Sequence, residues 1–235
     1  SRHELSPVFS PDGKDVFFIT WSDRDLGGIF KVSVRGGRPK PVLMTPGHYV
    51  DLNISEDGKM LVFSKLSGSA LTNPHWGSNP GIYTYTLGED HTEFVSERGR
   101  SPHFGPNKRI FATERMRTAT GRGSDDAATD LISMTLDGKA IRTHATSPLA
   151  TVIQISPTGS HVAYREAGRL YAAALPATGR SVTLSSVADI DSGPSAFATE
   201  RISASGGEFI KWSRDGQALT WSIGPRFMQY RIDAS

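Results

Sequence analysis

A repeat with five copies constrains this chain more than any other feature of its sequence. Each copy has an apolar residue, a serine or another small residue, a short polar turn and a run that favours a β-strand. The copies begin at Phe9, Ile54, Phe104, Ile155 and Trp212. Their turn glycines are at positions 13, 58, 159 and 216, and Asn107 takes this place in the shorter third copy. The copies are therefore 45, 49, 52 and 57 residues apart, which indicates one supersecondary unit used repeatedly.

The first copy predicts four strands. Residues 8–10 end a short strand, and Pro11-Asp12-Gly13 makes a turn, because proline presets φ, aspartate bonds nearby backbone and glycine accepts a positive φ. Residues 16–21 are apolar almost throughout, as in a strand that is covered on both faces. Residues 29–34 alternate between apolar and polar, and residues 41–43 form an outer strand after a Gly-Gly turn.

The other copies repeat this pattern, and no stretch of more than about ten residues has helical periodicity. We therefore expect an all-β fold, a β-propeller with four-stranded antiparallel blades and about five blades in residues 1–235. The blades are expected at approximately residues 5–46, 50–97, 101–147, 150–204 and 208–235, with the last one incomplete. In the fourth blade the outer strand is either 182–184 or 199–203, and Asp137-Gly138 predicts a hairpin in the third.

The two ends of the sequence bear on how a propeller would close. Residue 1 comes just before an innermost strand, and the chain ends after the third strand of the fifth copy. A closed propeller usually completes its last blade with a strand from the other end of the chain, which removes an exposed edge. The first residues offer no spare outer strand, so we expect the chain to be part of a larger propeller. Five blades that close alone are the alternative.

Composition argues against several classes of protein. Lys and Arg number 26 against 24 Asp and Glu, and the densest basic stretches, residues 97–100 and 114–117, each include an acid. Nucleic-acid binding is therefore not expected. The chain has no cysteine, which excludes disulfides and thiolate metal sites. No apolar run approaches the roughly 18 residues that span a bilayer, so membrane insertion is not expected either.

The sequence predicts no catalytic residue. The seven histidines are dispersed without the His-x-His or His-Glu-x-x-His spacing of metal hydrolases. Residues 77–81 approach a Gly-x-Ser-x-Gly elbow, but the serine is misplaced and no helix follows. Asp189, Asp191 and Glu200 are weak candidates for calcium ligands, because Pro194 stands where a calcium loop needs glycine. We expect no metal and no other cofactor in this chain.

Two insertions between strands are the candidates for interaction. Residues 66–80 contain His75 and Trp76, and a tryptophan exposed in a loop is suited to contact a partner. Arg115 precedes the insertion at residues 116–129, and Arg122 lies within it. Loops carried by a rigid β scaffold are where binding residues concentrate. We expect the partner to be an adjacent catalytic domain or another protein.

The Ser-Pro-Asp-Gly-Lys turn at 10–14, the apolar strand after it and the Ile-Phe-Lys-Val strand at 29–32 resemble the TolB-type propeller repeat. This repeat also occurs in the tricorn protease and in prolyl-oligopeptidase-like peptidases. Residues 206–225 resemble more specifically the last blade before the catalytic domain of bacterial proteins that fuse such a propeller to a metal-dependent amidohydrolase. That resemblance implies a hydrolase domain, with its zinc and its catalytic residues, beginning after Ser235.

The resemblance implies a non-catalytic propeller of a larger hydrolase, acting as scaffold, substrate gate or interaction surface. The alternatives are a TolB-like interaction module of the bacterial envelope and the propeller of a prolyl-oligopeptidase-like serine peptidase. A propeller lyase with its site in the central channel ranks last, because the inner strands offer few His or carboxylate side chains. A periplasmic or otherwise extracytoplasmic location follows from the resemblance.

Overall fold

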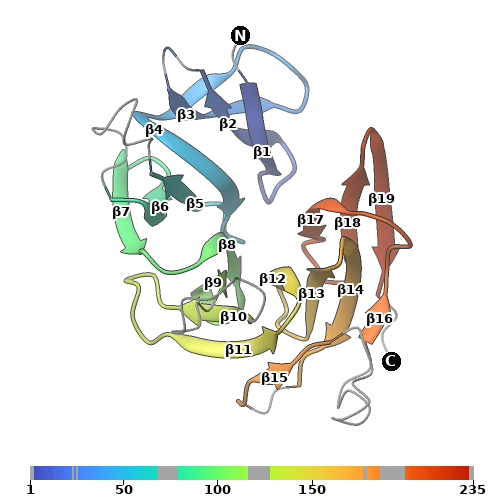
Figure 1. Cartoon of the computed structure of the whole chain (residues 1–235). Helices are drawn as coiled ribbons and strands as arrows, with labels where there is room; N and C mark the ends of the chain where they lie inside the picture. The colour runs from blue at the N-terminus through green and yellow to red at the C-terminus, as the bar shows by residue number, and fades with distance from the viewer. Residues whose placement is uncertain are drawn as a thin grey trace. The chain divides into compact units, whose positions relative to one another are not determined.

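The computed structural model describes residues 3–22, 24, 26–67, 79–115, 128–176, 179–185 and 199–232 (Figure 1). In these ranges the regular structure consists of strands, apart from one 3₁₀ turn at Pro106–Lys108. The all-β prediction is confirmed. The chain divides into two compact units, one of residues 1–104 with 136–139 and one of residues 105–135 with 140–235.

The first unit contains a seven-stranded antiparallel sheet whose strands follow chain order. Its strands are β1 (His3–Phe9), β2 (Asp15–Trp21), β3 (Gly27–Ser33), β4 (Lys40–Ile54), β5 (Met60–Leu66), β6 (Gly81–Thr86) and β7 (His91–Ser96). The first part of β4 pairs with β3 and its second part pairs with β5. The long β4 therefore contains the outer strand expected for the first copy of the repeat and the inner strand of the second.

The second unit contains further sheets, and the third, fourth and fifth copies of the repeat each supply the main antiparallel strands of one sheet. The third copy contributes β9 (Arg109–Arg115), β10 (Thr129–Met134) and β11 (Arg142–Ser147); the fourth, β12 (Ala150–Ile155), β13 (His161–Glu166) and β14 (Arg169–Ala174); the fifth, β17 (Glu208–Trp212), β18 (Ala218–Ile223) and β19 (Arg226–Arg231). β8 (Arg100–Gly105) precedes β9 in the chain. The hairpin expected at Asp137-Gly138 joins β10 to β11, which pair antiparallel.

The structure decides between the two candidates for the outer strand of the fourth copy. β16 (Thr199–Arg201) pairs antiparallel with β14 and takes that place. β15 (Val182–Thr183) instead pairs in parallel with β11, and the N–H of Leu184 donates to the Thr146 carbonyl at 2.8 Å. A segment of the fourth copy thus covers the outer edge of the third copy's sheet, which protects backbone groups that an edge strand leaves unpaired.

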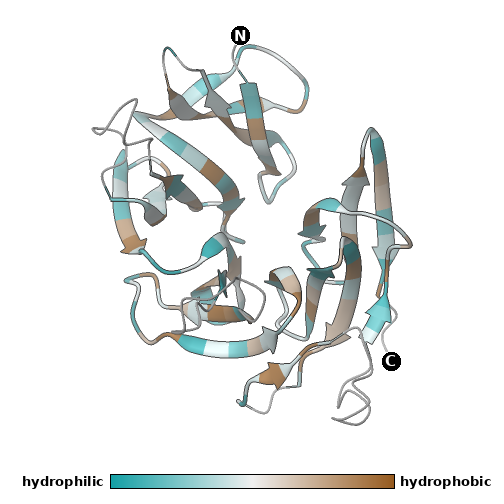
Figure 2. Cartoon of the chain, in the orientation of Figure 1, coloured by the Kyte–Doolittle hydropathy of each residue, from teal (hydrophilic) through white to brown (hydrophobic). Residues whose placement is uncertain are grey.

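Within each unit the strands of successive copies pack face to face. In the first unit Phe17 and Ile29 on β2 and β3 pack with Leu61 and Phe63 on β5. In the second unit one apolar cluster joins the third and fourth copies, and another joins the fourth and fifth through residues such as Trp221. Figure 2 shows the apolar residues along the strands. The second strand of most copies is buried on both faces, which explains its unbroken apolar sequence.

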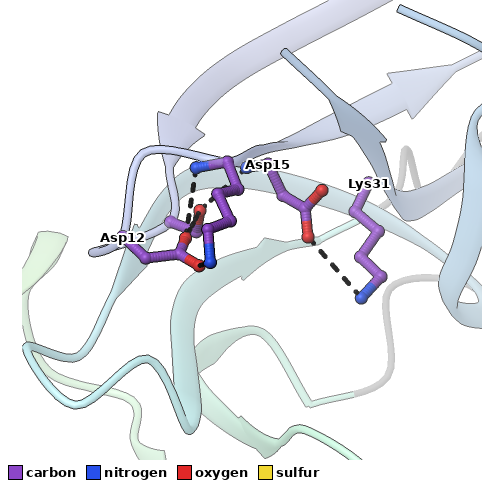
Figure 3. A network of polar contacts seen from close by, with 5 residues as sticks. Asp12, Asp15 and Lys31 are labelled. Carbon is purple, nitrogen blue, oxygen red and sulfur yellow. Dashed lines mark hydrogen bonds and ion pairs between the residues drawn. The ribbon is translucent and has the colours of Figure 1, made fainter. Parts of the chain in front are cut away.

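Ser10 organises the first turn of the repeat. Its hydroxyl donates to Oδ1 of Asp12 (2.6 Å) and accepts from the N–H of Asp15 (2.9 Å), while the N–H of Gly13 donates to the Ser10 carbonyl (2.9 Å). The hydrogen bond from Ser10 lowers the pKa of Asp12, because it stabilises the carboxylate. Figure 3 shows Asp12 in this network and the Asp15–Lys31 ion pair (3.9 Å) beside it.

The same turn recurs along the chain with its hydrogen bonds. The serine-to-aspartate distance is 2.6 Å in the second copy and 2.5 Å in the fifth. In the fourth copy Thr158 replaces the aspartate, and its hydroxyl lies 3.1 Å from that of Ser156. The four turn glycines have φ between 69° and 79°, and Asn107 adopts φ 59°. Asparagine therefore provides in the third copy the left-handed conformation that glycine provides in the others.

Turns of successive copies also touch one another. A Cβ added to Gly58 would lie 3.2 Å from the Pro11 ring, and one added to Gly159 would lie 2.8 Å from the Pro106 ring. Gly216 packs in the same way on Thr158, at 3.1 Å. Two constraints therefore favour glycine at each of these positions: the positive φ, and the close contact with the turn of the preceding copy.

Side chains link neighbouring inner strands in the first unit. Ser6, Asp51 and Ser101 have φ of 49°, 58° and 51°, and Ser6 and Asp51 lie at β-bulges in β1 and β4. The Asp51 N–H donates to the Ser6 hydroxyl (3.2 Å), and the Ser101 N–H donates to the Asp51 carboxylate (3.1 Å). The Phe104 N–H likewise donates to Oδ1 of Asn53 (3.2 Å). These bonds satisfy backbone donors on strands that belong to different copies of the repeat.

Restoring aspartate to the fourth turn should stabilise the chain. In Thr158→Asp the new carboxylate can accept from the Ser156 hydroxyl, as Asp12 does from Ser10. We expect a gain of about 0.5–1 kcal/mol in the free energy of unfolding at pH 7, measured by urea denaturation. A carboxylate with a lowered pKa stabilises only while ionised, so the gain should vanish as pH falls through that pKa. The prediction is wrong if Thr158→Asp is no more stable than Thr158→Ala.

Candidate functional site

A hollow of about 770 Å³ lies in the first unit, where β5 and β7 end and β6 begins. Its lining includes Leu66, Ser67, Asn79 and Pro80. These four residues are the described ends of the insertion at residues 66–80, which the sequence indicated as an interaction loop. The volume falls within the range of ligand-binding clefts, about 300–1,000 Å³.

A row of aromatic rings leads from the core of the first unit to this hollow. Tyr49 packs edge-on against Phe63 (5.1 Å between centroids), Phe63 stacks with Tyr83 (6.3 Å), and Tyr83 packs edge-on against Phe94 (5.4 Å). Tyr49 is 4% exposed, and burial raises its pKa to about 12. Phe94 is 52% exposed. The half-exposed Phe94 ring is therefore held in place by the rings that pack behind it, and its exposed part is a firm apolar surface for a ligand.

Gly81 lines the hollow and has no room for a side chain. Its φ is +155°, and an added Cβ would lie 2.5 Å from the Ser96 carbonyl oxygen and 2.8 Å from the Phe94 ring. Glycine thus allows the Phe94 ring to lie close against β6. The Tyr83 hydroxyl donates to the Asn79 carbonyl at 2.6 Å, which fixes this ring to the end of the insertion.

The charged groups of the hollow are mainly cationic. Lys65 and Arg100 line it together with one acid, Glu97. The Lys65 ammonium lies 5.8 Å from the centroid of the Tyr83 ring, a distance typical of a cation–π contact. Burial raises the pKa of Tyr83, so the ring stays neutral beside this cation. The hollow therefore combines positive charge with aromatic surface.

Ser64 also lines the hollow, and its buried hydroxyl has no hydrogen-bond partner among the described residues. Successive side chains on a strand point to opposite faces, so Ser64 and Lys65 lie on opposite faces of β5. The Ser64 hydroxyl is buried, so a ligand in the hollow does not reach it.

The structure describes only two of the residues that the sequence singled out. Arg115 is exposed at the end of β9, and Glu200 lies exposed on β16, where it accepts a hydrogen bond from the Tyr230 hydroxyl. His75, Trp76, Arg122, Asp189 and Asp191 lie outside the described residues. In the described part of the chain, no three His, Asp or Glu side chains are grouped so as to hold a metal ion.

A serine–histidine contact that the sequence did not indicate joins β10 to β11. The Ser133 hydroxyl lies 2.7 Å from Nε2 of His144 and accepts from Nε of Arg109 at 2.8 Å. Burial, and then the charges of Arg109 and Arg142, lower the pKa of His144. Ser133 is completely buried, so no substrate reaches its oxygen. The contact therefore links two strands and does not form a nucleophile–base pair.

The comparison with known proteins identifies the fold. No protein-family model matches the chain, and no curated protein matches its sequence. TolB from Acinetobacter baumannii is similar in structure, with a TM-score of 0.61 and 15% identity over 97% of this chain and 51% of that protein. For hydrazine synthase from Kuenenia stuttgartiensis the TM-score is 0.63, with 11% identity over 98% of this chain and 37% of that one.

A putative TolB from Agrobacterium tumefaciens has a TM-score of 0.53 and 17% identity, over 83% of this chain and 63% of that protein. The chain thus spans about half of the Acinetobacter TolB and less than two thirds of the others. Its fold is that of a TolB-like β-propeller, as the repeat predicted. No helix in the described ranges is long and apolar enough to cross a membrane.

Replacing Gly81 by alanine should disrupt the hollow. The added methyl group meets the Ser96 carbonyl and the Phe94 ring, and alanine is strained at φ +155°. We expect a loss of about 1–3 kcal/mol in the free energy of unfolding and a change in the near-ultraviolet circular dichroism of the aromatic rings. Gly168→Ala is the control, because its φ is +75° but nothing lies near the added methyl group. Equal losses in the two variants would contradict close packing at Gly81.

His144 should make stability depend on pH. The pKa of His144 is lowered in the folded chain. The stability that depends on neutral His144 is therefore complete above the pKa of this group in the unfolded chain, near 6.5, and is lost as pH falls through the lowered pKa. In His144→Gln the amide oxygen can still accept from Ser133, and we expect a smaller loss of stability between pH 7.5 and 5 in urea denaturation. Burial also lowers the pKa of His161, so part of the dependence of stability on pH should remain in His144→Gln. If the dependence of stability on pH is unchanged in His144→Gln, His144 is not its source.

Proposed function

We propose that this chain is a non-catalytic β-propeller module that binds another protein or an adjacent domain through the hollow at β5, β6 and β7. The observation that carries this proposal is the half-exposed Phe94, supported by a buried aromatic row and flanked by the cations Lys65 and Arg100. Aromatic residues and arginine are enriched where proteins bind one another. We propose also that the chain forms about five blades of a larger propeller.

We propose further that the parent protein is a hydrolase, with a metal-dependent amidohydrolase as the first choice. The support is the resemblance of residues 206–225 to the blade before the catalytic domain of propeller–amidohydrolase fusions. The propeller would then act as scaffold, substrate gate or interaction surface, and zinc would belong to the other domain. A TolB-like interaction module of the envelope is the second candidate, favoured by the structural similarity to TolB. Either role implies an extracytoplasmic location.

The sequence of the parent protein after Ser235 tests the first choice. A strand ending in His-x-His within the next hundred or so residues supports an amidohydrolase, because these residues bind its metal. A Gly-x-Ser-x-Gly elbow would move the assignment to a serine peptidase. A parent chain that stops near Ser235 would favour the envelope interaction module.

Variants at the hollow test the binding function. The chain, immobilised, is incubated with an extract of its source organism, and retained proteins are compared between the unchanged chain, Phe94→Ser and the control Phe9→Ser. Phe9 is 64% exposed in the same unit but does not line the hollow. We expect a protein that the unchanged chain and Phe9→Ser retain and Phe94→Ser loses. Retention that does not change in Phe94→Ser would place binding elsewhere.

A further inference from the structure

We propose that the hollow recognises an extended acidic peptide segment of its partner, with a carboxylate two positions from an aromatic or aliphatic side chain. This inference rests on the proposed binding function and specifies the chemistry of the ligand. Each part of the segment corresponds to a feature of the hollow.

The charges of the hollow favour a carboxylate. Two cations, Lys65 and Arg100, line it against the single acid Glu97, and they stand on two different elements, β5 and β8. Charge complementarity of this kind sets which partner binds and speeds its encounter. A basic segment would meet two like charges.

The aromatic surface favours an apolar side chain next to that carboxylate. Tyr83 and Phe94 are edge-to-face, and Lys65 lies over the Tyr83 ring, so cation and rings occupy one face of the sheet. The register confirms this placement, because Phe63 pairs with Tyr83, Tyr83 with Phe94 and Lys65 with Gly81. In an extended segment side chains two positions apart lie on one face, so an aromatic or aliphatic side chain on Phe94 would direct a carboxylate two positions away toward Lys65.

The extent of the hollow favours a segment over a single side chain. Its lining continues from the end of β5 across the start of β6 to Gly99, between β7 and β8, and Arg100 at the start of β8.

Selection from a random heptapeptide display library tests this inference. The full chain is compared with the double variant Lys65→Gln/Arg100→Gln and with the control Lys31→Gln/Arg38→Gln, which removes the same charge in the same unit. Lys31 matches Lys65 in its contact with an aromatic ring, because it lies 5.9 Å from the Phe17 ring and Lys65 lies 5.8 Å from Tyr83; Lys31 also pairs with Asp15. Circular dichroism and thermal unfolding establish that all three proteins are folded.

We expect the unchanged chain and the control to enrich peptides with Asp or Glu two positions from Phe, Tyr, Trp or Leu. A synthetic copy of an enriched peptide should bind the Lys65→Gln/Arg100→Gln variant roughly tenfold more weakly, and Phe94→Ser likewise, with affinity that falls as salt is added. No enrichment, enrichment of basic or neutral peptides, or equal binding by the double variant overturns the inference. Binding of an oligouronate probe without any acidic peptide also overturns it and assigns the hollow to acidic sugars.

The same experiments separate this inference from the proposed function. If a protein from the extract is lost in Phe94→Ser but the library yields no acidic peptide, the binding function stands and the ligand chemistry is wrong. If neither experiment shows dependence on the hollow, both proposals fail.

Discussion

Burial of both faces of a sheet is the constraint on which this structure depends. A single four-stranded sheet of this size cannot exclude water from its apolar side chains, and it becomes stable only when another sheet covers each face. The second strands meet this need with unbroken apolar runs, such as Leu61, Val62 and Phe63, all completely buried. Adjacent residues of one strand thus contribute to two different interfaces. The strand β18 departs from the rule, because its sequence alternates and Thr220 and Ser222 are only partly buried.

Sequence reasoning predicted the features that local chemistry determines. The repeat turns were predicted residue by residue, including asparagine in place of glycine at 107, because a turn depends on four or five consecutive residues and their own hydrogen bonds. The strands of each copy were predicted for the same reason, since a period of two or an apolar run is visible along the chain. The fold class followed from the repetition of these units.

The features that sequence reasoning missed depend on pairings between distant residues. The bulges at Ser6 and Asp51 leave no sign in composition, and their hydrogen bonds join residues 45 positions apart. β15 pairs with the preceding copy, although proximity in the chain favoured its own sheet. The hollow needed Gly81 opposite Ser96 and Phe94 against Tyr83, which only the register reveals. The sequence located the insertion beside it but not the aromatic and cationic residues that line it.

The contact between turns of successive copies has a consequence for how such a chain can vary over evolution. Because Gly159 rests on the Pro106 ring and Gly216 on Thr158, a change in one copy alters the space available to the next. Copies of the repeat are therefore not interchangeable parts, and a duplicated or transplanted copy would bring a turn fitted to a different neighbour. Divergence of the copies, visible here in Asn107 and Thr158, is expected to proceed in matched steps between adjacent units.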